Sequence, residues 1–135
     1  EALYASGDGV TVPRGSFRGT FLCFLDTRGA RRWHWRAFYA LAFRPSRFGV
    51  DFDSQRWSFS VPSLQMAHFE PRIQSSRWRD TQVVALHYQT SRLPSIIRGL
   101  LYDEVKPLSD DLVLGMGGVN AERDDGDHFF FALSR

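Results

Sequence analysis

Short runs of alternating apolar and polar residues recur along most of this chain, with turn-forming residues between them. Residues 16–25 (SFRGTFLCFL) place Phe17, Phe21 and Leu25 at even offsets, so these side chains share one face of an extended strand. Residues 81–90 (TQVVALHYQT) are the clearest strand, because β-branched and aromatic residues dominate them. The pattern therefore predicts β-strands over most of the chain.

Turn signals separate these strands at hairpin length. An Asp-Ser-Gln turn at residues 53–55 lies between the apolar runs 48–52 and 56–61, which predicts a β-hairpin. Pro71 lies near the end of the expected strand 64–73. Because proline cannot donate to a strand ladder, it confines this strand to an edge or a bulge.

Residues 100–120 (LLYDEVKPLSDDLVLGMGGVN) predict a second hairpin, with a connector at 107–111 and a glycine cluster at 115–118. No helix pattern follows the glycines, so we expect them to bend the backbone at the end of a strand rather than to cradle a nucleotide. A polar loop at 120–127 then leads to a final strand at 128–134.

Three segments are less regular. Residues 30–43 (ARRWHWRAFYALAF) fit an aromatic strand and also a short helix, and we favour strand or irregular structure. Residues 91–99 fit a turn of helix or a lid-like loop, and the Gly-rich residues 1–12 predict a loosely ordered lead-in.

The spacing of the strands predicts the fold class. About eight or nine short strands with little helix between them are typical of an all-β, antiparallel, up-and-down β-barrel. A chain of 135 residues is long enough to bury one core. We therefore expect residues 1–135 to form a single domain.

Composition excludes several classes of protein. No run of 18 apolar residues is present, so no membrane-spanning helix is expected. Cys23 is the single cysteine and lies in an apolar run, which predicts a buried side chain and favours a cytoplasmic location. A homodimer is an open alternative.

Charge is divided unevenly along the chain. Residues 1–99 carry 14 arginines and 7 acidic residues, whereas residues 100–135 carry 3 basic and 8 acidic residues. The arginines are dispersed among aromatic residues instead of forming one stripe, so we expect no nucleic-acid partner. We expect ion pairs between the two parts of the chain.

Four short motifs, at residues 17–19, 102–105, 114–117 and 129–133, resemble those of small bacterial lipocalin-like barrels in the calycin group. The resemblance implies a barrel of eight or more strands that encloses a site for an apolar or amphipathic small molecule. Related barrels include carriers, haem proteins and some cyclases or isomerases, so the fold alone does not choose among these functions.

The predicted function is binding of a hydrophobic or amphipathic small molecule, of lipid, polyketide or terpenoid type, in the barrel cavity. One alternative is a cyclase or isomerase that acts in the same cavity through positioning and acid/base help. A haem-binding barrel and a protein-interaction module are further alternatives, and no cofactor is expected. The residues predicted to contact the ligand are Trp35, Tyr39, Phe69, His87, Tyr88, Tyr102, Asp103 and Met116.

Two histidines lie on strands that are expected to pair. In one register His68 lies opposite His87, and Glu70 shares their face because side chains alternate along a strand. These three residues form the candidate metal site, and the two imidazoles are also candidate acid/base groups. A register slipped by one residue sets His68 against Leu86 and separates the cluster. A structural or solvated role is favoured for this patch.

Asp103 and Glu104 are neighbours, so their side chains point to opposite faces of a strand. The face of Asp103 is the more apolar, which predicts that Asp103 points into the barrel and Glu104 outward to an arginine. An enclosed carboxylate needs a partner or a proton, so Asp103 is the third catalytic candidate. His128, at the start of the last strand, is an alternative haem ligand.

Overall fold

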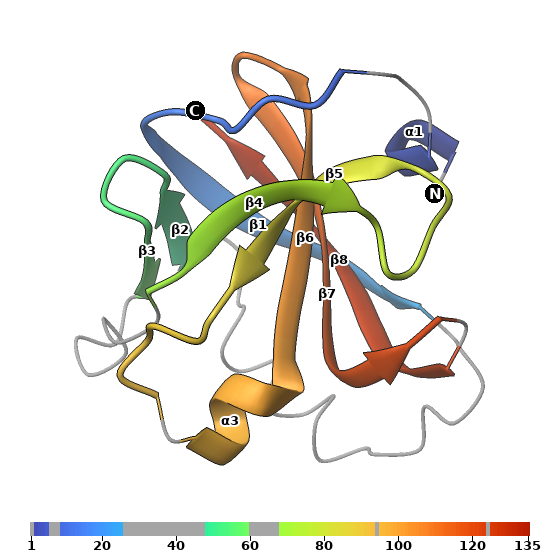
Figure 1. Cartoon of the computed structure of the whole chain (residues 1–135). Helices are drawn as coiled ribbons and strands as arrows, with labels where there is room; N and C mark the ends of the chain where they lie inside the picture. Colours follow the sequence, from blue (N-terminus) through green and yellow to red (C-terminus); the bar gives the residue numbers. More distant parts are fainter. Residues whose placement is uncertain (1, 6–8, 26–47, 60–67, 94, 124) are drawn as a thin grey trace.

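The computed structural model describes residues 2–5, 9–25, 48–59, 68–93, 95–123 and 125–135. Their elements, in chain order, are α1 (Ala2–Ala5), β1 (Ser16–Leu25), β2 (Phe48–Asp51), β3 (Arg56–Phe59), β4 (Glu70–Ser75), β5 (Gln82–His87), α3 (Ser95–Leu100), β6 (Leu101–Ser109), β7 (Leu112–Glu122) and β8 (Asp125–Ser134). The strands dominate the molecule (Figure 1). Within these residues, no helix has the length and apolar character needed to cross a membrane.

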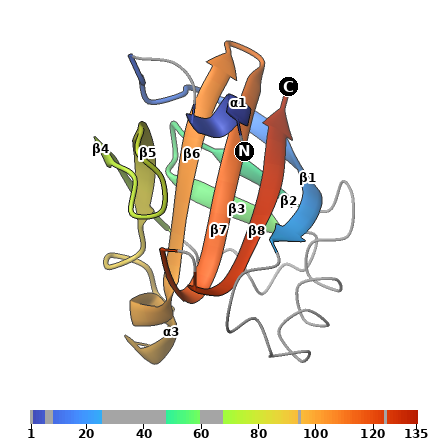
Figure 2. The same ribbon diagram turned by 90° about the vertical axis from the view of Figure 1, so that its right-hand side faces the viewer.

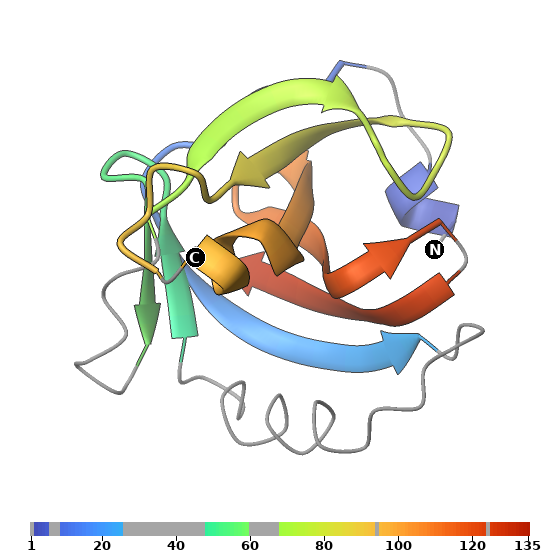
Figure 3. The same cartoon turned by 60° about the horizontal axis from the view of Figure 1, so that its bottom comes forward.

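All eight strands belong to one antiparallel sheet, in the order β3-β2-β1-β8-β7-β6-β5-β4. Consecutive strands are neighbours except β3 and β4, and β8 returns to pair with β1. The sheet curls into a half-barrel (Figure 3). Its two edges meet where Arg56 bridges His68 and the Phe69 N–H donates to the Gln55 carbonyl at 3.0 Å. The predicted all-β, antiparallel, barrel-like fold is confirmed.

The concave face of the sheet is filled mainly with aromatic rings. Trp57 packs edge-on against Phe131 at 5.6 Å and against Phe69 at 6.4 Å between ring centres. Burial of such large apolar side chains is the main favourable term in folding, and edge-to-face contacts add to it. The buried residues of this inner core are Phe17, Phe48, Val50, Phe52, Trp57, Phe69, Val84, Leu86, Tyr88, Val105, Val113, Phe129, Phe131 and Leu133.

The convex face is also covered, by α1 and by the loop between β4 and β5. Figure 2 shows α1 in front of β6 and β7. Tyr4 of α1 is fully buried, and Trp78 of the loop is 1% exposed. The lead-in predicted to be loosely ordered is therefore helical and packed over residues 2–5. The buried residues of this outer core are Tyr4, Trp78, Val83, Ala85, Tyr102, Met116 and Phe130.

Several predicted boundaries are confirmed. Strand β1 occupies the predicted residues 16–25, and a turn separates β2 from β3 at residues 52–55. Pro71 lies in β4, which is an edge strand of the sheet. Residues 30–43 lie outside the described residues, as do residues 64–67 at the start of the predicted fourth strand.

Other local predictions are wrong. The connector of the second hairpin is shorter than predicted, because β6 continues through Pro107 to Ser109. The polar loop before the last strand is also shorter, because β7 extends to Glu122 and β8 begins at Asp125. Cys23 is exposed instead of buried, since the register of β1 against β8 shifts just before it and alternation no longer holds.

The glycines of β7 serve close packing rather than a bend. A Cβ atom on Gly115 would lie 2.1 Å from the ring of Phe131, and one on Gly117 would lie 2.3 Å from both Asp103 Oδ1 and the Phe129 ring. The pairing of β7 with β6 and β8 is regular through these positions. The predicted strand-end bend is therefore wrong: the glycines make room for aromatic side chains and for Asp103.

Candidate functional site

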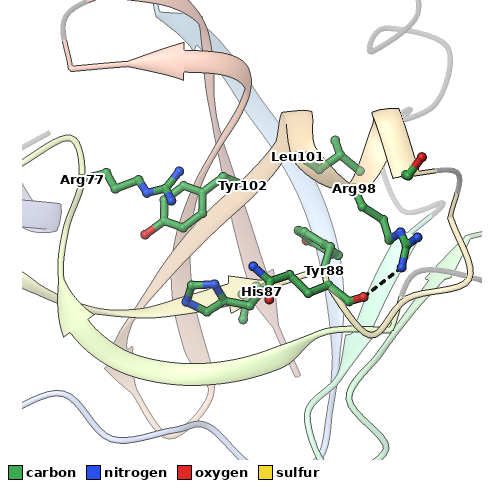
Figure 4. Close-up of a pocket in the computed structure, with 10 residues that line it drawn as sticks. Arg77, His87, Tyr88, Arg98, Leu101 and Tyr102 are labelled. Atoms are coloured by element: carbon green, nitrogen blue, oxygen red, sulfur yellow. Dashed lines mark hydrogen bonds between the residues drawn. The ribbon is translucent and has the colours of Figure 1, made fainter.

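A pocket of about 340 Å³ lies beside α3, at one end of the curled sheet (Figure 4). Its walls come from β5, β6, α3 and the loop between β4 and β5. This volume is at the small end of the range for small-molecule sites. The lining residues are Arg77, Leu86, His87, Tyr88, Gln89, Ser95, Arg98, Gly99, Leu101 and Tyr102.

Two arginines enter the pocket from different elements. Arg98 of α3 donates from Nη1 to the Gln89 carbonyl at 3.0 Å, which ties the helix to the end of β5. The guanidinium of Arg77 lies over the Tyr102 ring, 4.1 Å from its centre. Figure 4 shows the two arginines on different sides of the pocket. Both contacts hold a cationic group at the rim.

His87 is held as a neutral imidazole. Its Nε2 atom lies 3.0 Å from Gln74 Oε1, and Gln74 Nε2 donates to the Tyr102 hydroxyl at 3.0 Å. Because the amide oxygen can only accept, Nε2 of His87 carries the proton. Burial lowers the pKa of His87 first, and the charges of Arg72 and Arg77 lower it further, against the raising effect of Glu70. His87 is therefore a polar contact at neutral pH, not a third cation.

Glu104 lies directly behind this network and is completely buried. It accepts hydrogen bonds from Tyr4 (3.1 Å), Ser76 Oγ (2.5 Å), the Arg77 N–H (2.6 Å) and Tyr102 (2.9 Å). Burial and then the Glu104 charge raise the pKa of both tyrosines, so both remain donors. Glu104 points to the convex face, as predicted, but it is buried there. The predicted pairing with an arginine side chain is wrong, because four other donors surround the carboxylate.

Asp103 points to the opposite, concave face, where its side chain is enclosed, so its predicted interior position is confirmed. Tyr88 donates a short hydrogen bond to Asp103 Oδ2, and Trp57 Nε1 donates to the Tyr88 hydroxyl at 2.8 Å. Burial raises the pKa of Asp103 to about 7, the Tyr88 hydrogen bond opposes this, and Glu104 adds to it. Asp103 therefore titrates near neutrality beneath the pocket, separated from it by Tyr88.

The predicted ligand residues fall into separate places. Three of them, His87, Tyr88 and Tyr102, line the pocket. Phe69 lies in the inner core and Met116 in the outer core, on opposite faces of the sheet. Asp103 is enclosed under Tyr88, and Trp35 and Tyr39 lie outside the described residues.

The register that would bring His68 opposite His87 is wrong. His87 pairs with Glu70 across β4 and β5, whereas His68 bridges Arg56 at the other edge of the sheet. Arg72 binds Glu70 through two hydrogen bonds, at 3.0 and 3.1 Å. Within the described part of the chain, no group of three His, Cys, Asp or Glu residues could hold a metal ion.

His128 is buried in the outer core and not at an open site. Its Nε2 atom donates to the carbonyls of Glu122 (2.8 Å) and Asp125 (2.9 Å), and its ring packs edge-on against Trp78 at 4.7 Å. Among the residues that the structure describes, Nδ1 has no hydrogen-bond partner. The hydrogen bonds from Nε2 of His128 stabilise the turn between β7 and β8. Because the ring is enclosed, His128 does not present a nitrogen to a haem iron.

The sequence did not single out Arg77, Arg98 or Gln89 as site residues. Arg98 follows two isoleucines in a segment expected to be a turn of helix, and Arg77 lies in a polar loop. Each arginine has an acidic residue within five positions, Asp80 for Arg77 and Asp103 for Arg98, so local charge pattern gave no signal of an unpaired cation. Dispersed arginines are common on protein surfaces, so their presence could not have located a pocket.

Comparison with known proteins adds little. No protein-family model matches the chain, and no curated protein matches it. Among solved structures, the chain is similar to the crystal structure of a protein from Thermomonospora curvata, with 17% sequence identity and a TM-score of 0.49. The alignment covers 93% of this chain and 79% of that chain.

Proposed function

We propose that this protein binds a small amphipathic molecule in the pocket beside α3. The observation that carries the proposal is the combination of the Tyr88 and Tyr102 rings and Leu101 with Arg98 and the neutral His87 in one concave site. Rings and an aliphatic side chain take up an apolar body, and a few polar groups fix its orientation. The sequence resembles lipocalin-like barrels, and binding of an apolar ligand by such a barrel would be a variant of the same function.

The proposed ligand position is at the rim, not in the middle of the barrel. Ring contacts among Phe48, Trp57 and Phe131 fill the concave face; Phe131 packs edge-on against the other two rings. Tyr88 lies between this core and the pocket. A ligand at the rim needs no rearrangement of these rings. This placement is consistent with well-packed interiors, which resist insertion of additional groups.

Binding is favoured over the cyclase or isomerase alternative because of the positions of the acid/base groups. Asp103, whose pKa is about 7, does not line the pocket and contacts it through the Tyr88 hydroxyl. A catalytic acid or base must come within hydrogen-bond reach of the reacting atom. His87 does line the pocket, but its Nε2 proton is directed to Gln74 Oε1, so this group orients a ligand in the proposal.

Gly99 offers a direct test. It lines the pocket, its φ is not in the left-handed region, and an added Cβ atom would meet nothing within 4 Å. Gly99→Phe therefore adds a side chain at the pocket whose Cβ atom has room, and replacing a helical glycine does not cost helix stability. Thr20→Phe, which adds a ring to the exposed side of β1, is the matched control.

The assay is an amide chemical-shift titration with cinnamate, cinnamyl phosphate, cinnamamide and cinnamyl alcohol. We expect at least one of these probes to shift the amides of Gln89, Gly99 and Leu101 in the wild type and in Thr20→Phe. The shifts should be lost in Gly99→Phe, with its unfolding temperature unchanged. Binding that persists in Gly99→Phe, or no binding of any probe to the wild type, would overturn the proposal.

A further inference from the structure

The pocket is unusual in its charge. In the described part of the chain, its lining residues include two guanidinium groups, Arg77 and Arg98, and no carboxylate. Elsewhere among the described residues, Arg72, Arg123 and Arg135 form ion pairs with Glu70, Asp80 and Asp111. Arginines on a protein surface often find such partners, so a concave site that gathers two cations and no anion has an unmatched positive charge.

Arg98 keeps most of its hydrogen-bonding capacity. One N–H donates to the Gln89 carbonyl at 3.0 Å, and no ion pair joins Arg98 to any residue in the described part of the chain. A guanidinium has five N–H donors, so four remain for a ligand. Because Arg98 is half-buried and its helix is tied to β5 through this contact, the side chain is already positioned and loses little freedom on binding.

Arg77 is positioned by two contacts that do not neutralise it. Its backbone N–H donates to Glu104 at 2.6 Å, and its guanidinium lies 4.1 Å from the centre of the Tyr102 ring. Stacking on a ring face engages the guanidinium plane and leaves the in-plane N–H groups able to donate. The charge of Arg77 is therefore held at the pocket and available to an anion.

The nearest negative charges are already engaged. Glu104 accepts four hydrogen bonds and is completely buried, and Glu70 is bound by Arg72. Asp103 lies beneath Tyr88, on the far side of the pocket wall. None of the three carboxylates lines the pocket, so an incoming anion would not face a carboxylate from the described residues at its surface.

We propose that the ligand of this pocket is an organic anion: a carboxylate or phosphate monoester attached to an aromatic or apolar body. This inference rests on the proposed function and narrows its ligand class. Arg98 binds the acidic group, because guanidinium donors match the oxygens of carboxylates and phosphates. The charge of Arg77, on the other side of the pocket, adds to the positive potential that attracts the acid. Tyr88, Tyr102 and Leu101 contact the body of the ligand.

The test uses the intact chain and the same probes, which differ in the head group alone. We expect cinnamate or cinnamyl phosphate to bind at least about tenfold more tightly than cinnamamide, since a hydrogen bond to a charged group exceeds a neutral one by that order. The ratio of the two acids also distinguishes a carboxylate site from a phosphate site. Raising the salt concentration should weaken binding of the acids and leave cinnamamide unchanged.

Substitution of Arg98 and Arg77 tests whether these two side chains contribute to binding of the acid. Arg98→Gln should weaken binding of the preferred acid by about tenfold, and Arg77→Gln should weaken it by a smaller factor. Both should change cinnamamide binding by less than about twofold. Arg18→Gln makes the same charge change on the exposed side of β1 and should leave both probes unaffected. Unfolding temperatures of the three variants separate a loss of ligand contact from a loss of fold.

Three outcomes would overturn the inference. If cinnamamide binds as tightly as the acids, the ligand is not selected for its negative charge, and only the proposed binding function of the pocket remains supported. No probe binding at the pocket would reject both. An equal loss of acid affinity in Arg18→Gln and Arg98→Gln would show that net charge, rather than these two arginines, attracts the acids.

Discussion

Asp103→Asn isolates one ionisable group in the core while keeping the size of the side chain. The pKa of Asp103 is about 7 in the folded chain, against 3.8 for an unperturbed aspartate, chiefly because burial disfavours its charge. A raised pKa means that the folded chain holds the proton more tightly than the unfolded chain. The resulting stabilisation is complete below the unfolded pKa and is lost as the pH rises through the folded pKa.

The magnitude follows from the two pKa values. The rise from 3.8 to about 7 corresponds to about 4 kcal/mol of unfolding free energy. At roughly pH 5, Asp103 is already mostly ionised in the unfolded chain, so part of this stabilisation is absent at that pH. The remaining stabilisation, about 2.5 kcal/mol, is lost between roughly pH 5 and pH 8. Asparagine does not titrate. Its unpaired amide donor costs about 1–3 kcal/mol at either pH.

Urea denaturation followed by tryptophan fluorescence measures this directly. We expect the stability of Asp103→Asn relative to the wild type to be about 2.5 kcal/mol greater at pH 8 than at pH 5, because only the wild type loses stability over this range. Because both chains share every other titrating group, the difference isolates Asp103. A relative stability that is the same at both pH values would refute the raised pKa and the enclosure that causes it.

The same variant separates two roles for Asp103. Asp103 does not line the pocket, so Asp103→Asn should bind the preferred cinnamyl probe within about twofold of the wild type. Retained binding with altered stability leaves a structural role. Lost binding in a folded variant would instead place Asp103 in contact with the ligand, contrary to its position beneath Tyr88.

Two further substitutions test the packing of each face. Gly115→Ala should lower the unfolding free energy by about 1–3 kcal/mol, because its Cβ atom would lie 2.1 Å from the Phe131 ring. Gly99→Ala is the control, since an added Cβ atom there meets nothing within 4 Å. It should be neutral or stabilising in the same urea titration. Tyr4→Phe should cost about 1–2 kcal/mol, because Glu104 loses one of its four donors while the ring contact with Phe130 is kept. An unchanged thermal transition would show that the Tyr4 hydroxyl does not stabilise the outer core.

Local pattern predicted the strands well, because the cause of each strand lies within a few residues. Residues 16–21 alternate, and β1 spans the predicted residues 16–25. The turn at residues 53–55 separates β2 from β3. The interior position of Asp103 also follows from alternation, since its face of β6 carries Val105. The connections could not be bounded as well, because strand pairing extends β6 and β7 into residues that are polar in sequence.

Non-local features were not predictable. Alternation places Glu104 on the convex face, but only the contacts of Tyr4 and of the loop at Ser76 reveal that this face is covered. The register of β4 against β5, which pairs His87 with Glu70, depends on the packing of both faces. The pocket needs α3, β5 and a loop to meet, so no single stretch of sequence contains it.

The buried carboxylate of Glu104 also sets an order on folding. Its partner Tyr4 is 100 positions earlier in the chain, whereas Tyr102 is two positions away. During synthesis Tyr4 leaves the ribosome long before Glu104 exists, and closing so long a loop is entropically costly. We therefore expect α1 to dock after β6 and its neighbours have formed. Until then the outer core, with Trp78 and Met116, faces solvent, and the nascent chain is most exposed to self-association at this stage.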